Sequence, residues 1–262
     1  MKKLLNYLLL FPFIINAQIA TIDIIQVKDG MEDDYEAVEA FVAPIQKEAI
    51  KQGRKFAWYI LKRVSGGDLS EIEDKGIGDY MIINSYASKE QMESDNWDEY
   101  TEIAKKVYKG KMSSRKITQK MSSLINPRKD TRSYVIENIY WTKPNLSEEA
   151  NGQLVSIFPA EALSDDYEKF EMEFFRHEWE KNILLGNHLS WNFNRIIDRS
   201  DNAYQNLTHI IFNRGVPGAK YVFADDFKSA VVREAGFASR KGFNGAEMKL
   251  IFMELGEIPS MD

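Results

Sequence analysis

Residues 33–36 read Asp-Asp-Tyr-Glu, and residues 165–168 read Asp-Asp-Tyr-Glu again. A glycine follows the tyrosine of each copy, 18 residues later in the first and 19 later in the second, and a tryptophan lies five residues beyond each glycine: Gly53 and Trp58, then Gly186 and Trp191. A recurring segment of this kind indicates that one structural unit is present twice in the chain.

The residues that follow each copy predict one helix and one strand. In the first copy Tyr35, Val38, Val42 and Ile45 recur at helical spacing, and the acids before them favour a helix N-terminus. Each glycine is a suitable helix stop. Apolar residues then alternate as in a strand, over residues 56–64 in the first copy and 189–193 in the second.

The remaining elements complete the order β-α-β-β-α-β in each copy. First strands are predicted at 21–28 and 152–158, third strands at 80–86 and 207–213, second helices at 88–107 and 225–235, and fourth strands at 134–141 and 248–255. This order is the ferredoxin-like arrangement. The predicted fold is therefore α+β, with ferredoxin-like repeats at 18–143 and 152–262 and a polar linker at 144–151.

The repeat, the element order and the segment Gly-Met-Glu-Asp-Asp-Tyr-Glu (residues 30–36) resemble the dimeric α+β barrel superfamily. Its members include antibiotic-biosynthesis monooxygenase-like and NIPSNAP-like proteins. In that superfamily two ferredoxin-like units pair their sheets into a barrel with the helices outside. The resemblance implies that a tandem duplication supplies both units here. The chain would be a pseudo-dimeric α+β barrel, either monomeric or paired again as a homodimer.

The first seventeen residues predict export. Lys2 and Lys3 precede an apolar run over residues 4–15, and Ala17 supplies a small residue for cleavage. This layout is typical of a secretory signal peptide, and the run is too short for a membrane span. We expect a periplasmic or extracellular protein, without a membrane span.

Composition excludes several classes of function. The net charge is −6, and removal of two lysines with the signal peptide makes it −8, so general nucleic-acid binding is not expected. The absence of cysteine excludes disulfides, thiolate metal sites and a cysteine nucleophile. Nucleotide-binding and hydrolase motifs are also missing, and the residues name no cofactor.

Alignment of Tyr35 with Tyr167 places His177 opposite Ile45, on the inward face of its helix. A buried histidine needs partners for its ring nitrogens. His177 is therefore a candidate acid or base, a ligand to a metal or haem iron, a substrate anchor, or a core histidine satisfied by a neighbour.

The second strands also differ between the copies. Ala57, Tyr59 and Leu61 are replaced by Ser190, Asn192 and Asn194. A strand face that changes from apolar to polar predicts either the lining of a polar cavity or a face in contact with water. His188 and His209 lie on neighbouring strands of the same copy. The three histidines lack metal-ligand spacing, so no metal site is assigned.

Three functions remain open from the sequence. The first is an exported small-molecule-binding protein whose pocket, in the second repeat, takes a small apolar or aromatic ligand or haem. The second, implied by the resemblance, is a cofactor-independent or haem-linked monooxygenase. The third is a non-catalytic structural or interaction module. For the first two, we predict catalytic roles for His177 and Asn192, and ligand-binding roles for Trp191, Asn194, His188 and His209.

Overall fold

The computed structural model describes residues 19–67, 77–142 and 154–256. The predicted signal peptide and the predicted linker lie outside these ranges. Among the described residues no helix combines the length and the apolar character that a membrane crossing requires.

Two units of similar element order follow one another along the chain. Unit one contains β1 (Ile19–Val27), α1 (Glu32–Lys51), β2 (Ala57–Gly66), β3 (Tyr80–Tyr86), α2 (Lys89–Ser94), η2 (Trp97–Glu99), α3 (Tyr100–Val107), α4 (Ser114–Ser122) and β4 (Arg128–Trp141). Unit two contains β5 (Leu154–Ala162), α5 (Tyr167–Phe170), η4 (Glu171–Phe175), α6 (Arg176–Leu184), β6 (His188–Arg199), β7 (His209–Gly215), α7 (Phe227–Ala238), β8 (Arg240–Gly242) and β9 (Ala246–Leu255).

The strands close into one antiparallel barrel. Unit one supplies the order β4-β1-β3-β2, and unit two supplies β9-β5-β7-β6 with β8 beside β5. The units are joined at both edges, where β2 pairs with β9 and β4 pairs with β6. Each unit therefore has the ferredoxin-like strand order, and the predicted fold class is confirmed. One chain supplies the whole barrel.

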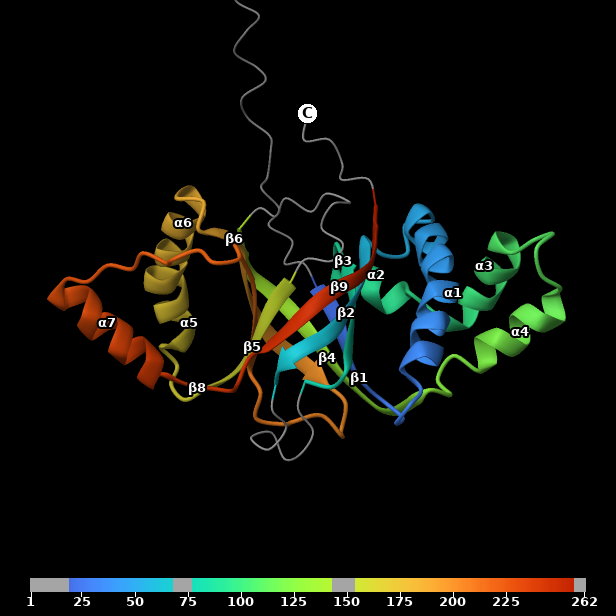
Figure 1. Cartoon of the computed structure of the whole chain (residues 1–262), viewed down its shortest axis with the longest axis horizontal. Coiled ribbons are helices and arrows are strands. Elements are labelled where there is room, and N and C mark those ends of the chain that lie inside the picture. Colours follow the sequence, from blue (N-terminus) through green and yellow to red (C-terminus); the bar gives the residue numbers. More distant parts are fainter. Residues whose placement is uncertain (1–18, 68–76, 143–153, 257–262) are drawn as a thin grey trace, which may run out of the picture.

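The helices of the two units cover opposite sides of the barrel (Figure 1). A first group of buried apolar residues, with members from both units, fills the inside of the barrel. Separate groups lie between each half of the sheet and its own helices. The strands are consequently covered on both faces, and successive side chains of a strand enter different compartments.

Two local predictions are corrected. The single helix predicted over 88–107 is divided into α2, η2 and α3, because the Asn96 side chain accepts a hydrogen bond from the backbone of Asp98 and starts a new turn. Helix α4 was not predicted; Ser113 caps it by accepting a hydrogen bond from the Lys116 backbone.

Candidate functional site

The first helix of unit two contains an extra residue. Helices α5, η4 and α6 run continuously from Tyr167 to Leu184, and η4 is a π-helical segment. A π segment inserts one residue into the helical repeat, which explains why Gly186 follows its tyrosine at an interval one residue longer than Gly53 does. Both glycines have positive φ, as a left-handed helix stop requires.

This insertion moves His177 away from the core. Before the π segment the two helices match, but after it every position is rotated by one residue. The buried positions are then Tyr167, Glu171, Phe175, Glu178 and Asn182. The His177 side chain is 59% exposed and contacts Glu180 across 3.2 Å. The prediction that His177 faces inward is wrong, and this histidine lies outside the cavities described below.

Strand β6 sends its side chains to two compartments. Ser190, Asn192 and Asn194 line a cavity inside the barrel, whereas Trp191 lines a cavity on the helix side of the sheet. The polar strand face recognised in the sequence therefore faces the barrel interior. A register shift between His188 and Ser190 breaks the alternation, and His188 packs against Trp179 of α6.

The cavity between the sheet and the helices of unit two, called the helix-side cavity here, has a volume of about 410 Å³. Nearly half of its lining is aromatic: Phe158, Phe175, Trp179, Trp191, Phe223, Phe237 and Phe243. The polar lining residues include Glu171, Asn213, Arg233 and Arg240. An apolar cavity with a few polar groups is the usual form of a small-molecule site.

Glu171 is the most unusual of these polar groups. The residue is 2% exposed, and a carboxylate oxygen lies 3.0 Å from a guanidinium nitrogen of Arg240. Arg240 also donates a hydrogen bond to the Tyr167 hydroxyl at 3.4 Å. Burial raises the pKa of Glu171 to about 7, although Arg240 and Tyr167 act in the opposite direction. A carboxyl group with such a pKa can accept or release a proton near neutral pH.

One buried donor in the wall of the helix-side cavity has no partner among the described residues, the indole nitrogen of Trp191. The side-chain oxygen of Asn213 and the ring nitrogens of His188 make no hydrogen bond of good geometry, although Asn213 interacts with His188 and raises its pKa. All three residues are buried, and burial lowers the pKa of His188. Buried polar groups are normally paired, so unpaired ones in a cavity wall favour interaction with a ligand.

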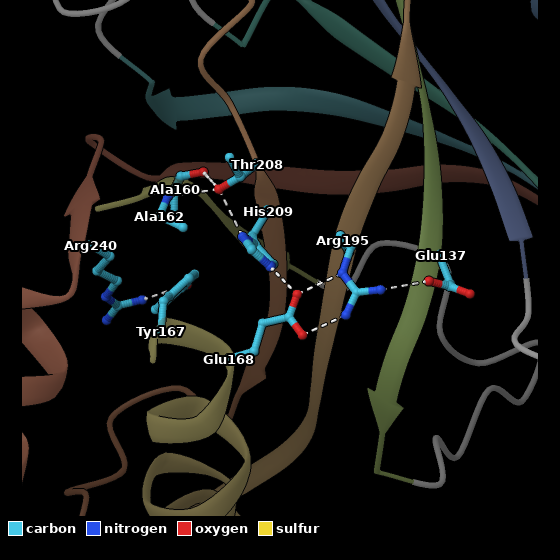
Figure 2. A network of polar contacts seen from close by, with 9 residues as sticks. All are labelled: Glu137, Ala160, Ala162, Tyr167, Glu168, Arg195, Thr208, His209 and Arg240. Carbon is cyan, nitrogen blue, oxygen red and sulfur yellow. Dashed lines mark hydrogen bonds and ion pairs between the residues drawn. The ribbon is translucent and has the colours of Figure 1, made fainter. Parts of the chain in front are cut away.

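His209 belongs to a different arrangement (Figure 2). Its Nε2 atom lies 3.0 Å from Glu168, whose carboxylate is also held by two guanidinium nitrogens of Arg195; Arg195 in turn bonds Glu137 of unit one at 3.1 Å. Burial lowers the pKa of His209, whereas the hydrogen bond from Arg195 lowers the pKa of Glu168. This network ties the start of α5 to the sheet and leaves little of His209 available to a ligand.

Unit one repeats both polar arrangements. Glu39, 2% exposed, lies 3.4 Å from Arg128, which stands over the ring of Tyr35. Arg240 stands over the ring of Tyr167 in the same way. The counterpart of the His209 network joins Glu36 to Lys62 at 2.6 Å and to the Tyr80 hydroxyl at 2.8 Å.

The matching cavity of unit one, about 330 Å³, differs in its polar wall. Lys55 stands where unit two has His188, three residues before the tryptophan. It bonds the Asn84 side-chain oxygen at 2.8 Å and pairs with buried Asp95 at 3.0 Å. Asn84 corresponds to Asn213, so the side-chain oxygen that faces His188 in unit two accepts a hydrogen bond from a lysine in unit one.

The predicted site residues are thus distributed over several places. Trp191 lies in the wall of the helix-side cavity, Asn192 and Asn194 lie in the barrel, and the pairing register puts His188 and His209 at opposite ends of the β6–β7 pair. Glu171 and Asn213 were not predicted as site residues, although the sequence repeat contains them. The repeat extends to Glu39 and Glu171, four residues after each tyrosine, and to Asn84 and Asn213, four residues into each third strand.

Metal and haem binding fit this arrangement poorly. No group of three histidine or carboxylate side chains in the described part of the chain could hold a metal ion. The described lining of the helix-side cavity also contains no histidine, cysteine, methionine or tyrosine, the residue types that ligate haem iron. The haem-linked alternative at His177 is therefore not supported, since that side chain is on the surface.

Comparison with solved structures agrees with this architecture. A candidate monooxygenase of Lactobacillus acidophilus matches with a TM-score of 0.55 and 11% identity, over 93% of this chain and 99% of that one. A candidate monooxygenase of Fusobacterium nucleatum subsp. nucleatum matches with a TM-score of 0.53 and 10% identity, over 92% and 95%. An anthrone oxidase-like protein gives 0.51 and 7%, over 93% and 95%.

The chain has the dimeric α+β barrel fold. At these identities the likeness establishes the fold alone. No protein-family model matches the sequence, and no curated protein matches it either.

The raised pKa of Glu171 predicts a particular pH dependence of stability. The folded protein holds a proton that the unfolded chain releases near pH 4.5, so stability from this group is present at low pH and lost as pH rises toward about 7. The difference in unfolding free energy between wild type and Glu171→Gln should therefore fall across this range, by on the order of 1 to 3 kcal/mol. Urea unfolding at a series of pH values measures it.

Glu168→Gln is the control for that measurement. The pKa of Glu168 is lowered, so its stabilisation is present at neutral pH and disappears on acidification, which is the opposite sign. A flat difference for Glu171→Gln between pH 4.5 and 7 would contradict a raised pKa at this carboxyl group.

Proposed function

We propose that this protein is a monooxygenase that oxidises a planar aromatic molecule with dioxygen in the helix-side cavity. One observation carries the proposal: Glu171 is buried in the wall of a cavity whose lining is nearly half aromatic. The names of the structural neighbours support the reaction class, since two are candidate monooxygenases and one is anthrone oxidase-like.

The chemistry follows from the groups present. Ionised Glu171 takes a proton from an acidic C–H bond of the substrate, such as a methylene group between two aromatic rings that is conjugated through them to a carbonyl. The carbanion gives its electron pair to dioxygen, and a C–O bond forms. Glu171 returns its proton to the peroxide so formed. Cleavage of the O–O bond and of the second C–H bond then leaves a ketone and releases water. The substrate methylene thus becomes a carbonyl, and dioxygen supplies one oxygen atom to the product and one to water.

Other residues hold the substrate in place. Arg240 stays paired with Glu171 and keeps its carboxylate in position. The free indole N–H of Trp191 is suited to donate a hydrogen bond to the substrate oxygen, where negative charge develops when the proton leaves. The side-chain oxygen of Asn213, which lines the cavity, is suited to accept a hydrogen bond from a substrate hydroxyl. The aromatic walls contact the faces of the rings.

We also infer that the two units descend from one duplicated ferredoxin-like unit. The Tyr-Glu-Arg arrangement of Tyr35, Glu39 and Arg128 and of Tyr167, Glu171 and Arg240 supports this origin. In unit one the buried Lys55–Asp95 pair lies in the lining of the cavity, so the site in unit two is the one we propose to be active.

The duplicated arrangement supplies a matched control for the test. With anthrone as substrate, Glu171→Gln should lower kcat/KM for dioxygen uptake at least about 100-fold, because the proton acceptor is lost. Glu39→Gln, the same change in unit one, should leave kcat/KM nearly unchanged. An equal loss in both variants would contradict a site in unit two.

Wild-type behaviour distinguishes the remaining alternatives. If wild type quenches its tryptophan fluorescence on binding anthraquinone but does not oxidise anthrone, the protein binds small molecules and the oxygenase proposal is rejected. If it neither binds nor oxidises these compounds, the non-catalytic module is favoured.

Export is part of the proposal, because residues 1–17 have the charge and apolar pattern of a signal peptide. Protein isolated from the periplasm or medium of an exporting host should have the intact mass of a chain that starts at Gln18. Full-length protein retained in the cytoplasm would contradict export.

A further inference from the structure

The barrel contains a buried arginine for which the described part of the chain supplies no counter-charge. Arg214 of β7 is 8% exposed, and among the described residues its side chain has no hydrogen-bond or ion-pair partner. It lines the cavity inside the barrel, called the barrel cavity here, which has a volume of about 150 Å³. A buried cation without a counter-charge is costly, and such groups are normally paired.

The surroundings of Arg214 have the character of an anion site. No acidic residue lines the barrel cavity in the described part of the chain. Ser190 lies opposite Arg214 in the β6–β7 pairing, and Asn192 follows on the same face. Asn138 of β4 donates to the Asn194 side-chain oxygen at 3.1 Å, and Asn194 donates to Asn192. Hydroxyl and amide groups thus line the same cavity as Arg214.

Unit one gives the same cavity an apolar wall. Its strands β2 and β3 lie across the barrel from β6 and β7 in the closed strand order. Tyr59 and Leu61 stand where unit two has Asn192 and Asn194, and Ser85 stands where unit two has Arg214. One side of the cavity is therefore cationic and polar and the facing side is apolar, an arrangement that matches a molecule with an anionic end and an apolar body.

We infer that the barrel cavity binds a small organic carboxylate with an aromatic or short aliphatic body. Its carboxylate pairs with the Arg214 guanidinium, which presents two parallel N–H donors, and Ser190 contributes a further donor. An apolar cavity of about this size accommodates a single benzene ring. Burial lowers the pKa of Arg214, yet an arginine keeps its charge in any protein, so the attraction persists at neutral pH.

This site is distinct from the proposed oxygenase site. Arg214 and Asn192 face the inside of the barrel, whereas Asn213 and Trp191, their neighbours along the strands, face the helices. Binding of a carboxylate in the barrel cavity therefore does not depend on any reaction at Glu171.

Calorimetric titration of the full chain with benzoate tests the inference. Wild type should bind benzoate at millimolar concentrations and bind benzyl alcohol, which has the same ring but no charge, at least about tenfold more weakly. Arg214→Gln should weaken benzoate binding at least about tenfold. Arg233→Gln, which removes an arginine from the helix-side cavity, should leave benzoate affinity unchanged.

Folding of the variants is measured in parallel. Arg214→Gln removes an unpaired buried charge, so its Tm without ligand should equal or exceed that of wild type. If this variant does not fold, Asn192→Leu takes its place and should reduce benzoate affinity, since it removes a polar group that lines the same cavity as Arg214. Absence of benzoate binding to wild type, equal binding of benzyl alcohol, or a loss in Arg233→Gln as large as in Arg214→Gln would overturn the inference.

Discussion

The strands of the barrel are covered on both faces, and side chains alternate between the faces at every residue. This constraint separates the two compartments of unit two. Along β7, Asn213 faces the helices and Arg214 faces the barrel; along β6, Trp191 and Asn192 do the same. Closure depends on the β2–β9 and β4–β6 pairings, which also remove the free edges that each four-stranded half would otherwise expose.

The two units share a buried glutamate, arginine and tyrosine, and they differ in the polar residues that line the cavity beside them. A glutamate is buried beside an arginine and a tyrosine in both, so this arrangement by itself indicates structure as much as activity. The difference lies in the polar wall. In unit one Lys55 satisfies Asn84 and Asp95, whereas in unit two Asn213 has only the buried His188 beside it, without a hydrogen bond of good geometry. The indole nitrogen of Trp191 has no partner among the described residues, and this is a group that a ligand would engage.

Much of the fold could be predicted because its causes are local. Helical and strand periodicity, the glycine stops and the repeated Asp-Asp-Tyr-Glu segment gave the element order, and the polar replacement at Asn192 and Asn194 correctly marked unit two as the unit with the altered strand face. The alignment failed at His177 because a π-helical residue shifts the phase of the helix, and periodicity alone does not locate such an insertion. In the sequence, the inserted residue shows itself by the interval from Tyr167 to Gly186, which is one residue longer than that from Tyr35 to Gly53.

The roles of Glu171 and Arg214 depend on contacts between distant segments. Glu171 meets Arg240 across 69 residues of sequence. Arg214 is notable because no acidic side chain is among the described residues that line the barrel cavity, and only the closed barrel shows this. Sequence spacing shows neither. Glu39 and Glu171 occupy equivalent positions of the repeat. Two exposed glutamates near the helix starts would give the same sequence pattern, so the sequence does not show that these two are buried.

A crystal structure of the chain grown with anthraquinone, a planar probe without acidic protons, shows whether the helix-side cavity of unit two is the binding site for planar aromatic molecules. We expect the molecule in the helix-side cavity, stacked on its aromatic walls with a carbonyl oxygen near the Trp191 indole nitrogen, and no such molecule in the cavity of unit one. Anthraquinone bound in unit one beside Glu39, or absent from the helix-side cavity at saturating concentration, would contradict this expectation.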